Sequence, residues 1–181
     1  MIPTKFNPLG TGDVTPTGIT VTPKTLSIDK ADTYPLTATV TPVGANPNVT
    51  WTTSNDTIAT VDATGVVTAI AAGKSTITAK SVNNLSATCT VTVTVPVDYI
   101  EIEPAAVTLP LKGSKILKAT VYPSNASNKT LVWSSEDTNI ATVSSSGTVT
   151  AKSLNGVVEI YATNAASGKR GVCVVTVGTG K

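Results

Sequence analysis

The chain has 181 residues, enough for two domains of ordinary size or for one large domain. Only 13% of the residues are charged and the formal net charge is +2, so the basic excess that nucleic-acid binding needs is missing. No stretch approaches about eighteen consecutive apolar residues, so no membrane-spanning helix and no membrane partner are expected.

Residues 1–17 form a segment of their own, in which three prolines and two glycines oppose both a helix and a regular strand. Ile2, Phe6 and Leu9 nevertheless place apolar side chains along it. Two interpretations are open: a disordered leader, or an extended peptide that becomes ordered on a partner with these three side chains as anchors. The segment lacks the charged and apolar regions of a signal peptide. If Met1 is the natural start, export by the general secretory route is therefore not expected.

From Gly18 onward the sequence contains the same pattern twice. The stretch Leu36–Pro42 returns 81 positions later as Leu117–Pro123, and Trp51 returns 82 positions later as Trp133. The increases in spacing fall in polar loops, where insertions cost little free energy. A duplicated domain explains this pattern.

A period near 80 residues is that of a whole domain. We predict an extended N-terminal segment at 1–17, a first domain at 18–96, a second at 97–178 and a C-terminal tail at 179–181. The joint from Thr94 to Asp98 is short, so the last strand of one domain runs almost directly into the next domain. This favours a semi-rigid two-domain spacer.

The alternation of side chains predicts strands throughout both copies. From Ala87 to Val95 every odd position is apolar and every even position is threonine, as in a strand with one buried face. Many short segments of this kind between turns indicate an all-β sandwich. Trp51 and Trp133 are predicted to be the large buried side chains between the sheets of each domain. Gly65 and Gly147 are expected to close hairpin turns with positive φ.

The two cysteines, Cys89 and Cys173, occupy equivalent positions on the core-facing side of the last strand of each copy. Equivalent residues of tandem domains lie about a domain length apart, far beyond the reach of a disulfide. Both are therefore predicted to be buried, reduced thiols that act as small apolar residues. That state fits folding in a reducing cytosol.

Both copies resemble the group 2 bacterial immunoglobulin-like (Big) domain. The residues that carry the resemblance are LTATVTP and LKATVYP, WTTS and WSSE, IATV in each copy, GVVTA and GTVTA, GKSTI and GVVEI, and VTV at 91–93 and 175–177. The resemblance implies two tandem Ig-like β-sandwiches. It also implies a spacer or binding module without a catalytic site, of the kind found in bacterial surface adhesins and in structural proteins of tailed bacteriophages.

Candidate chemistry outside the resemblance is sparse. The chain has no histidine, the commonest general base and transition-metal ligand, and no aromatic-lined cleft is indicated around its carboxylates. Asp98, Glu101 and Glu103 lie near the joint, where a calcium site is one interpretation, but Glu101 and Glu103 share the outer face of one strand without an Asp-x-Asp loop. A solvated strand face is favoured, and no metal, cofactor or enzyme activity is expected.

Two functions are open. The first is a non-enzymatic phage virion protein, made in the host cytoplasm and held to capsid or tail proteins by the N-terminal peptide. As a capsid decoration, head fibre or tail component it would display two Ig-like domains, with weak adhesion to bacterial-surface or mucus glycans and with homo-oligomerisation open. The alternative is a stalk fragment of an adhesin on the bacterial cell surface.

Overall fold

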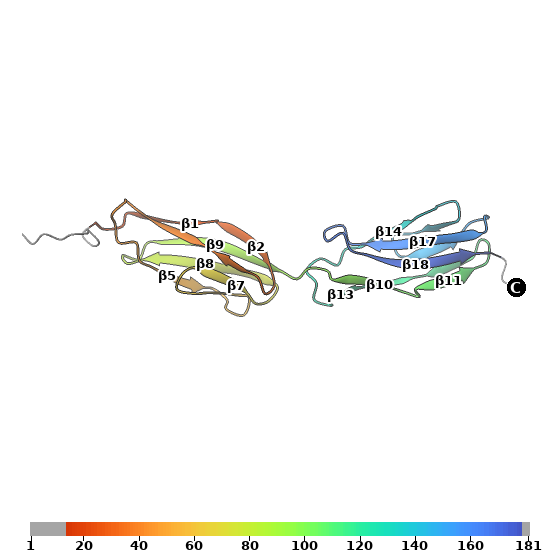
Figure 1. The fold of residues 1–181 in the computed structure, drawn as a ribbon, viewed down its shortest axis with the longest axis horizontal. Helices are drawn as coiled ribbons and strands as arrows, with labels where there is room; N and C mark the ends of the chain where they lie inside the picture. The colour runs from red at the N-terminus through yellow and green to blue at the C-terminus, as the bar shows by residue number, and fades with distance from the viewer. Residues whose placement is uncertain (1–13, 179–181) are drawn as a thin grey trace, which may run out of the picture. The chain divides into compact units, whose positions relative to one another are not determined.

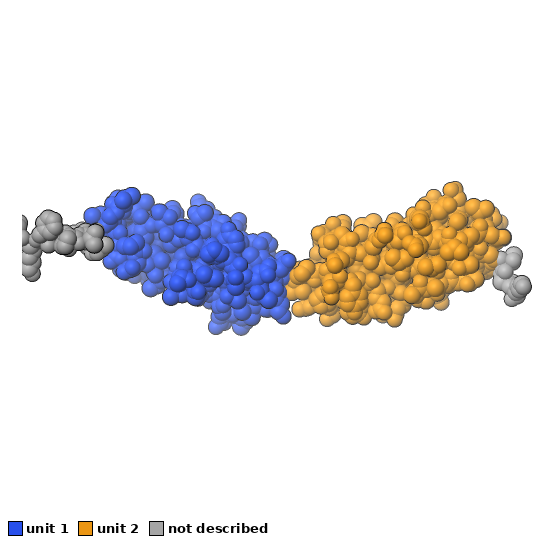
Figure 2. All heavy atoms as spheres, viewed as in Figure 1, with its two compact units in different colours: residues 1–94 blue, residues 95–181 orange. Residues whose placement is uncertain are grey.

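The computed structural model describes residues 14–178, which fall into two compact units that meet between Thr94 and Val95 (Figure 2). These residues form strands, turns and loops, and no helix among them is long and apolar enough to cross a membrane. The predicted all-β sandwich fold is confirmed.

Each unit contains nine strands within the described residues (Figure 1). The strands of the first unit are β1 (Gly18–Thr22), β2 (Thr25–Asp29), β3 (Thr33–Pro35), β4 (Thr37–Thr41), β5 (Val49–Thr53), β6 (Ala59–Val61), β7 (Val66–Ala69), β8 (Gly73–Ser81) and β9 (Ser86–Thr94). Those of the second unit are β10 (Tyr99–Glu103), β11 (Ala106–Leu109), β12 (Ser114–Ile116), β13 (Lys118–Tyr122), β14 (Val132–Ser135), β15 (Ala141–Val143), β16 (Thr148–Ala151), β17 (Gly156–Thr163) and β18 (Arg170–Val177).

The two units have the same topology. A four-stranded sheet has the order β2-β9-β8-β5 in the first unit and β11-β18-β17-β14 in the second. A three-stranded sheet, β3-β7-β6 or β12-β16-β15, and a two-stranded pair, β1-β4 or β10-β13, complete each sandwich. The β2–β9 and β11–β18 pairs are parallel, whereas the other named strand pairs are antiparallel. The duplication seen in the sequence is thus a duplication of the whole fold.

Alternation along the central strands builds each core. In β9 the side chains of Cys89, Val91 and Val93 are buried, while the threonines between them face outward. One cluster in each unit draws buried residues from all three of its sheets, and the two clusters share no residue. The largest fully buried side chains include Ile77 in the first unit and Ile160 in the second. Each unit therefore has a hydrophobic core of its own.

The two tryptophans are less buried than predicted. Trp51 and Trp133 are only partly buried, and they pack against the edge of each core rather than at its centre. The reason lies in the strand order, because β5 and β14 are the outermost strands of their four-stranded sheets. An edge strand has a neighbour on one side only, so one flank of each indole stays accessible.

The hairpin turns between β6 and β7 and between β15 and β16 follow the expected chemistry. Gly65 and Gly147 have φ of 89° and 83°, as predicted. In the first unit a carboxylate oxygen of Asp62 accepts the backbone N–H groups of Thr64 and Val66 at 2.8 and 3.0 Å. These hydrogen bonds favour the charged carboxylate and lower the pKa of Asp62, the bond from the Thr64 hydroxyl contributing most. Serine takes over this position in the second unit.

The second unit begins directly after β9. The Val95 N–H donates to Ser127 Oγ at 2.8 Å, and the Ser127 N–H donates to the Val95 carbonyl at the same distance. Val97 joins the core of the second unit, and the Asp98 N–H bonds the Tyr122 carbonyl. The second unit thus starts two residues before the predicted domain 97–178.

Candidate functional site

The two thiols are enclosed within the cores. Cys89 and Cys173 have no exposed surface and neither is in a disulfide. Burial raises the pKa of both thiols, which keeps them protonated and weakly nucleophilic. Among residues 14–178, no three His, Cys, Asp or Glu side chains gather closely enough to hold a metal ion.

The same hollow opens beside the tryptophan of each unit. Its volume is about 450 Å³ in the first unit and about 500 Å³ in the second. In the first unit Pro47, Asn48 and Thr64 add to the lining, and in the second Lys118, Ser145 and Ser146 do so. The lining at equivalent positions consists of Leu36, Ala38, Val49 and Trp51 in the first unit, and of Leu117, Ala119, Leu131 and Trp133 in the second.

Each indole is fixed in its hollow by a glycine turn. A Cβ atom on Gly65 would lie 2.9 Å from the Trp51 ring, and one on Gly147 would lie 2.9 Å from the Trp133 ring. The backbone of the turn and the ring are thus in direct contact, which only glycine permits. The accessible flank of each ring, with the hydroxyl and amide groups around it, forms a small amphipathic surface.

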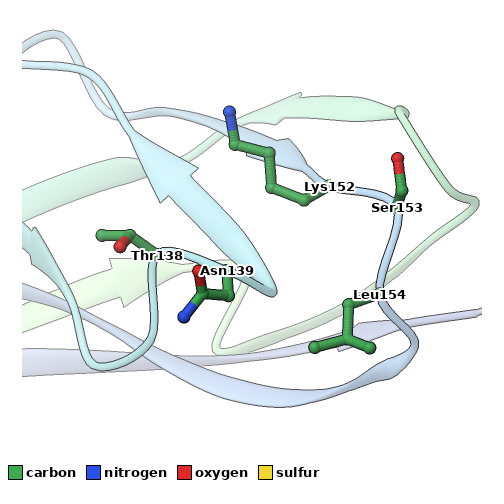
Figure 3. A pocket seen from close by; sticks show the side chains of 5 residues that line it. All are labelled: Thr138, Asn139, Lys152, Ser153 and Leu154. Atoms are coloured by element: carbon green, nitrogen blue, oxygen red, sulfur yellow. The ribbon is translucent and has the colours of Figure 1, made fainter.

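A third hollow of about 460 Å³ lies between two loops of the second unit (Figure 3). Thr138 and Asn139 come from the loop before β15, and Lys152, Ser153 and Leu154 come from the connection between β16 and β17. All five side chains are exposed. The hollow is therefore an open depression between two loops, and Lys152 gives it a single positive charge.

The acidic residues near the joint lie on an exposed strand face. Glu101 and Glu103 are exposed on β10, where Glu103 stands opposite Lys118 of β13. Beside them, the rings of Tyr99 and Tyr122 stack with centroids 4.6 Å apart. The negative charge of Glu101 is the main cause of a raised pKa at Tyr122, because it opposes ionisation of the phenol.

Ile2, Phe6 and Leu9, the predicted anchors, lie outside the described residues. The last residues of their segment, from residue 14 onward, are described, and they contact the first unit. Pro16 is buried, and its carbonyl accepts a hydrogen bond from Asn83 Nδ2 at 2.7 Å.

Comparison with known proteins identifies relatives of both units. A model of the family described as bacterial Ig-like domain (group 2) matches residues 15–91 and 96–175, which confirms the resemblance. An Ig-like virion protein of Serratia phage KSP90 is 31% identical over 167 residues, covering 88% of this chain and 64% of that protein. A minor capsid protein of Enterobacteria phage T3 is 38% identical over 87 residues, covering 48% of this chain and 20% of that protein.

A third relative is an enzyme. The lacto-N-biosidase of Bifidobacterium bifidum is 45% identical over 95 residues, which cover 50% of this chain but only 8% of that protein. The chain thus spans less than two thirds of the length of each of these three relatives.

Proposed function

The chain belongs to the bacterial Ig-like domain (group 2) family, and from this premise we propose that it is a non-enzymatic structural protein of a bacteriophage virion. The observation that carries the proposal is the likeness to the virion protein of Serratia phage KSP90, which extends through 88% of this chain and both of its domains. The likeness to a minor capsid protein supports a place on the particle. Both thiols of this chain are buried, and the hollows beside its two tryptophans are open to solvent. Such a surface suits display on a particle and contact with other molecules.

The N-terminal segment is proposed to attach the chain to other virion proteins. Ile2, Phe6 and Leu9 are the apolar side chains available for burial against a capsid or tail protein. Because Pro16 is already bound to Asn83 of the first domain, the tether consists of the residues before Val14. Capsid decoration or a head fibre is the preferred location, with the tail as the other.

The proposal predicts that the chain co-purifies with particles of the phage that encodes it. Virions banded on a density gradient would be probed with an antibody against residues 18–178. Substitution of Ile2, Phe6 and Leu9 by serine should lower the particle-bound signal at least tenfold. A control with Thr4, Asn7 and Thr11 replaced by serine should leave it unchanged. Deletion of residues 1–13 should act like the first variant while Pro16 keeps its contact with the first domain.

The outcomes of this experiment separate the parts of the proposal. Wild-type particles without the chain contradict the virion role as a whole. Particles that retain the chain after the leader substitutions contradict only the tether. Circular dichroism of each purified variant checks that both domains are folded.

A segment of a bacterial cell-surface adhesin is the second candidate. The lacto-N-biosidase supports only the part that concerns a longer protein, because there a stretch similar to half of this chain makes up 8% of the length. Under this alternative, the same antibody would find the chain within a larger polypeptide in the cell-envelope fraction of a bacterium and not in virions.

Weak adhesion to bacterial-surface or mucus glycans is the finer part of the proposal. The two tryptophan hollows support it, since a sugar ring stacks on an aromatic face while hydroxyl and amide groups bond its edges. Mucin-derived O-glycans should therefore change the tryptophan fluorescence in a saturable way. Replacing Asn48 by leucine and Ser146 by valine should weaken this binding at least threefold. A change that does not saturate would contradict glycan binding at these hollows.

A further inference from the structure

The outer face of the four-stranded sheet in the second domain carries exposed apolar side chains beside Thr108, Ser134, Thr163 and Thr176. Val157 and Val132 are 61% and 57% exposed, and Val172 and Val174 are each 37% exposed. Together with Tyr161 and Ala106 these side chains form what we call the valine face. They are contributed by all four strands, β11, β18, β17 and β14. An apolar surface of this kind on a soluble protein marks an interaction site.

The first domain shows that the fold does not need this surface. At the equivalent outward positions of β2, β9, β8 and β5, the first copy has only threonine and lysine. These residues are Thr25, Thr50, Lys74, Thr78, Thr88 and Thr90, which correspond to Ala106, Val132, Val157, Tyr161, Val172 and Val174. Since both copies fold alike, the apolar side chains of the second copy have a role outside folding.

The register of the sheet places opposite charges on the two sides of the Tyr161–Val172 pair. Tyr161 pairs with Val172 at its centre. One outward position along β18, the Arg170 guanidinium lies 4.4 Å from the centroid of the Tyr161 ring. In the other direction, Glu159 pairs with Val174 and accepts a hydrogen bond from the Tyr161 hydroxyl. The face is therefore basic on one side of the Tyr161–Val172 pair and acidic on the other.

We propose that the valine face binds the valine face of a second copy of this chain. A two-fold axis that lies between the two sheets and crosses the strands at the Tyr161–Val172 pair brings Arg170 of each copy onto the Glu159–Val174 pair of the other, about one strand spacing of 4.8 Å from Glu159. The face is thus complementary in charge to itself. Its β-branched side chains suit the flat packing of one sheet on another. This inference does not depend on the proposed virion role.

The area agrees with a reversible dimer. Four strands spaced about 4.8 Å apart, two of eight residues and two of four at about 3.3 Å per residue, offer roughly 380 Å² per copy. Two such faces bury roughly 760 Å², the size of a weak, transient interface. Association is therefore expected at high local concentration, such as that of many copies held on one surface.

Sedimentation equilibrium of the full chain in reducing buffer tests the proposal. The wild type should pass from monomer to dimer between about 10 µM and 1 mM, as a weak, transient interface would. Tyr161→Thr, Val172→Thr and Val174→Thr together should weaken association at least tenfold. At these three positions the variant has the threonines that the first domain has, so it should keep the fold. Val43→Thr is the control, because Val43 is fully exposed in the first domain and should leave dimerisation unchanged.

Charge exchange tests the orientation of the two copies. Arg170→Glu alone and Glu159→Arg alone should each weaken self-association, because each brings like charges together across the axis. An equimolar mixture of the two variants should restore dimers, since every contact then pairs opposite charges. A wild type that stays monomeric at 1 mM, or a threonine variant that associates like the wild type, overturns the proposal. The partner of the valine face would then be a different protein. A mixture that fails to regain dimers overturns the two-fold arrangement.

Discussion

Replacing Ile160 by alanine should lower the free energy of unfolding of the second domain by about 3–4 kcal/mol. Ile160 has no exposed surface and lies on β17, a central strand of the four-stranded sheet. The substitution removes three carbon atoms from the middle of the core and leaves a cavity that rigid strands cannot close. The measurement is urea unfolding followed by the fluorescence of Trp133, in a background where Trp51 is replaced by phenylalanine.

The first domain should not respond to this change. The two core clusters share no residue, so the substitution at Ile160 removes no contact from the first core. Ile77→Ala is the matched variant, because Ile77 holds the equivalent buried position on β8. Each core variant is followed in both single-tryptophan backgrounds, Trp51→Phe and Trp133→Phe, so that each domain has a reporter. Ile77→Ala should destabilise only the first domain. Loss of stability in both domains from either substitution would show that they unfold as one unit.

The sequence predicts the fold well because its main signals are local. The alternation of threonine with Cys89, Val91 and Val93 is enough to assign each face of β9 to the core or to solvent. The glycine turns at Gly65 and Gly147 could be predicted for the same reason, because positive φ favours glycine whatever lies elsewhere in the chain. The repeat then extends each of these predictions to a second domain.

Features that depend on strand order could not be predicted in this way. Alternation places Trp51 on the inward side of its strand. It does not show that β5 is the edge strand of the sheet, where the ring stays partly exposed. The start of the second domain likewise depends on a tertiary contact, because Val95 is held by Ser127 from a later loop. Periodicity contains no information on either pairing.

The valine face was accessible to sequence reasoning through a different comparison. Aligning the two copies at inward positions reveals the shared core, whereas aligning them at outward positions reveals where they differ. Thr88 and Thr90 of the first copy correspond to Val172 and Val174 of the second, and Thr78 corresponds to Tyr161. A duplicated domain thus supplies its own reference, since residues needed only for folding are expected in both copies.

Gly147→Ala tests the contact that fixes the tryptophan ring in the second domain. Its Cβ would lie 2.7 Å from the Leu117 carbonyl oxygen and 2.9 Å from Trp133 Cζ2, closer than real Cβ atoms approach. With φ at 83°, alanine also bears the cost of a left-handed backbone. The two effects together should lower the free energy of unfolding by about 2–4 kcal/mol. Urea unfolding followed by circular dichroism provides the measurement.

Gly168→Ala separates these two effects. Gly168 also has positive φ, at 71°, but a Cβ there would meet no atom within 4 Å. It should lose only about 1 kcal/mol, the conformational part of the cost. The first domain repeats the comparison with Gly65, whose Cβ would meet the Trp51 ring, and Gly44, which is open. Equal losses at Gly147 and Gly168 would show that the ring can yield, and that the turn does not fix the indole in its hollow. A larger loss at Gly147 means that the shape of the hollow is built into the turn, independently of any ligand.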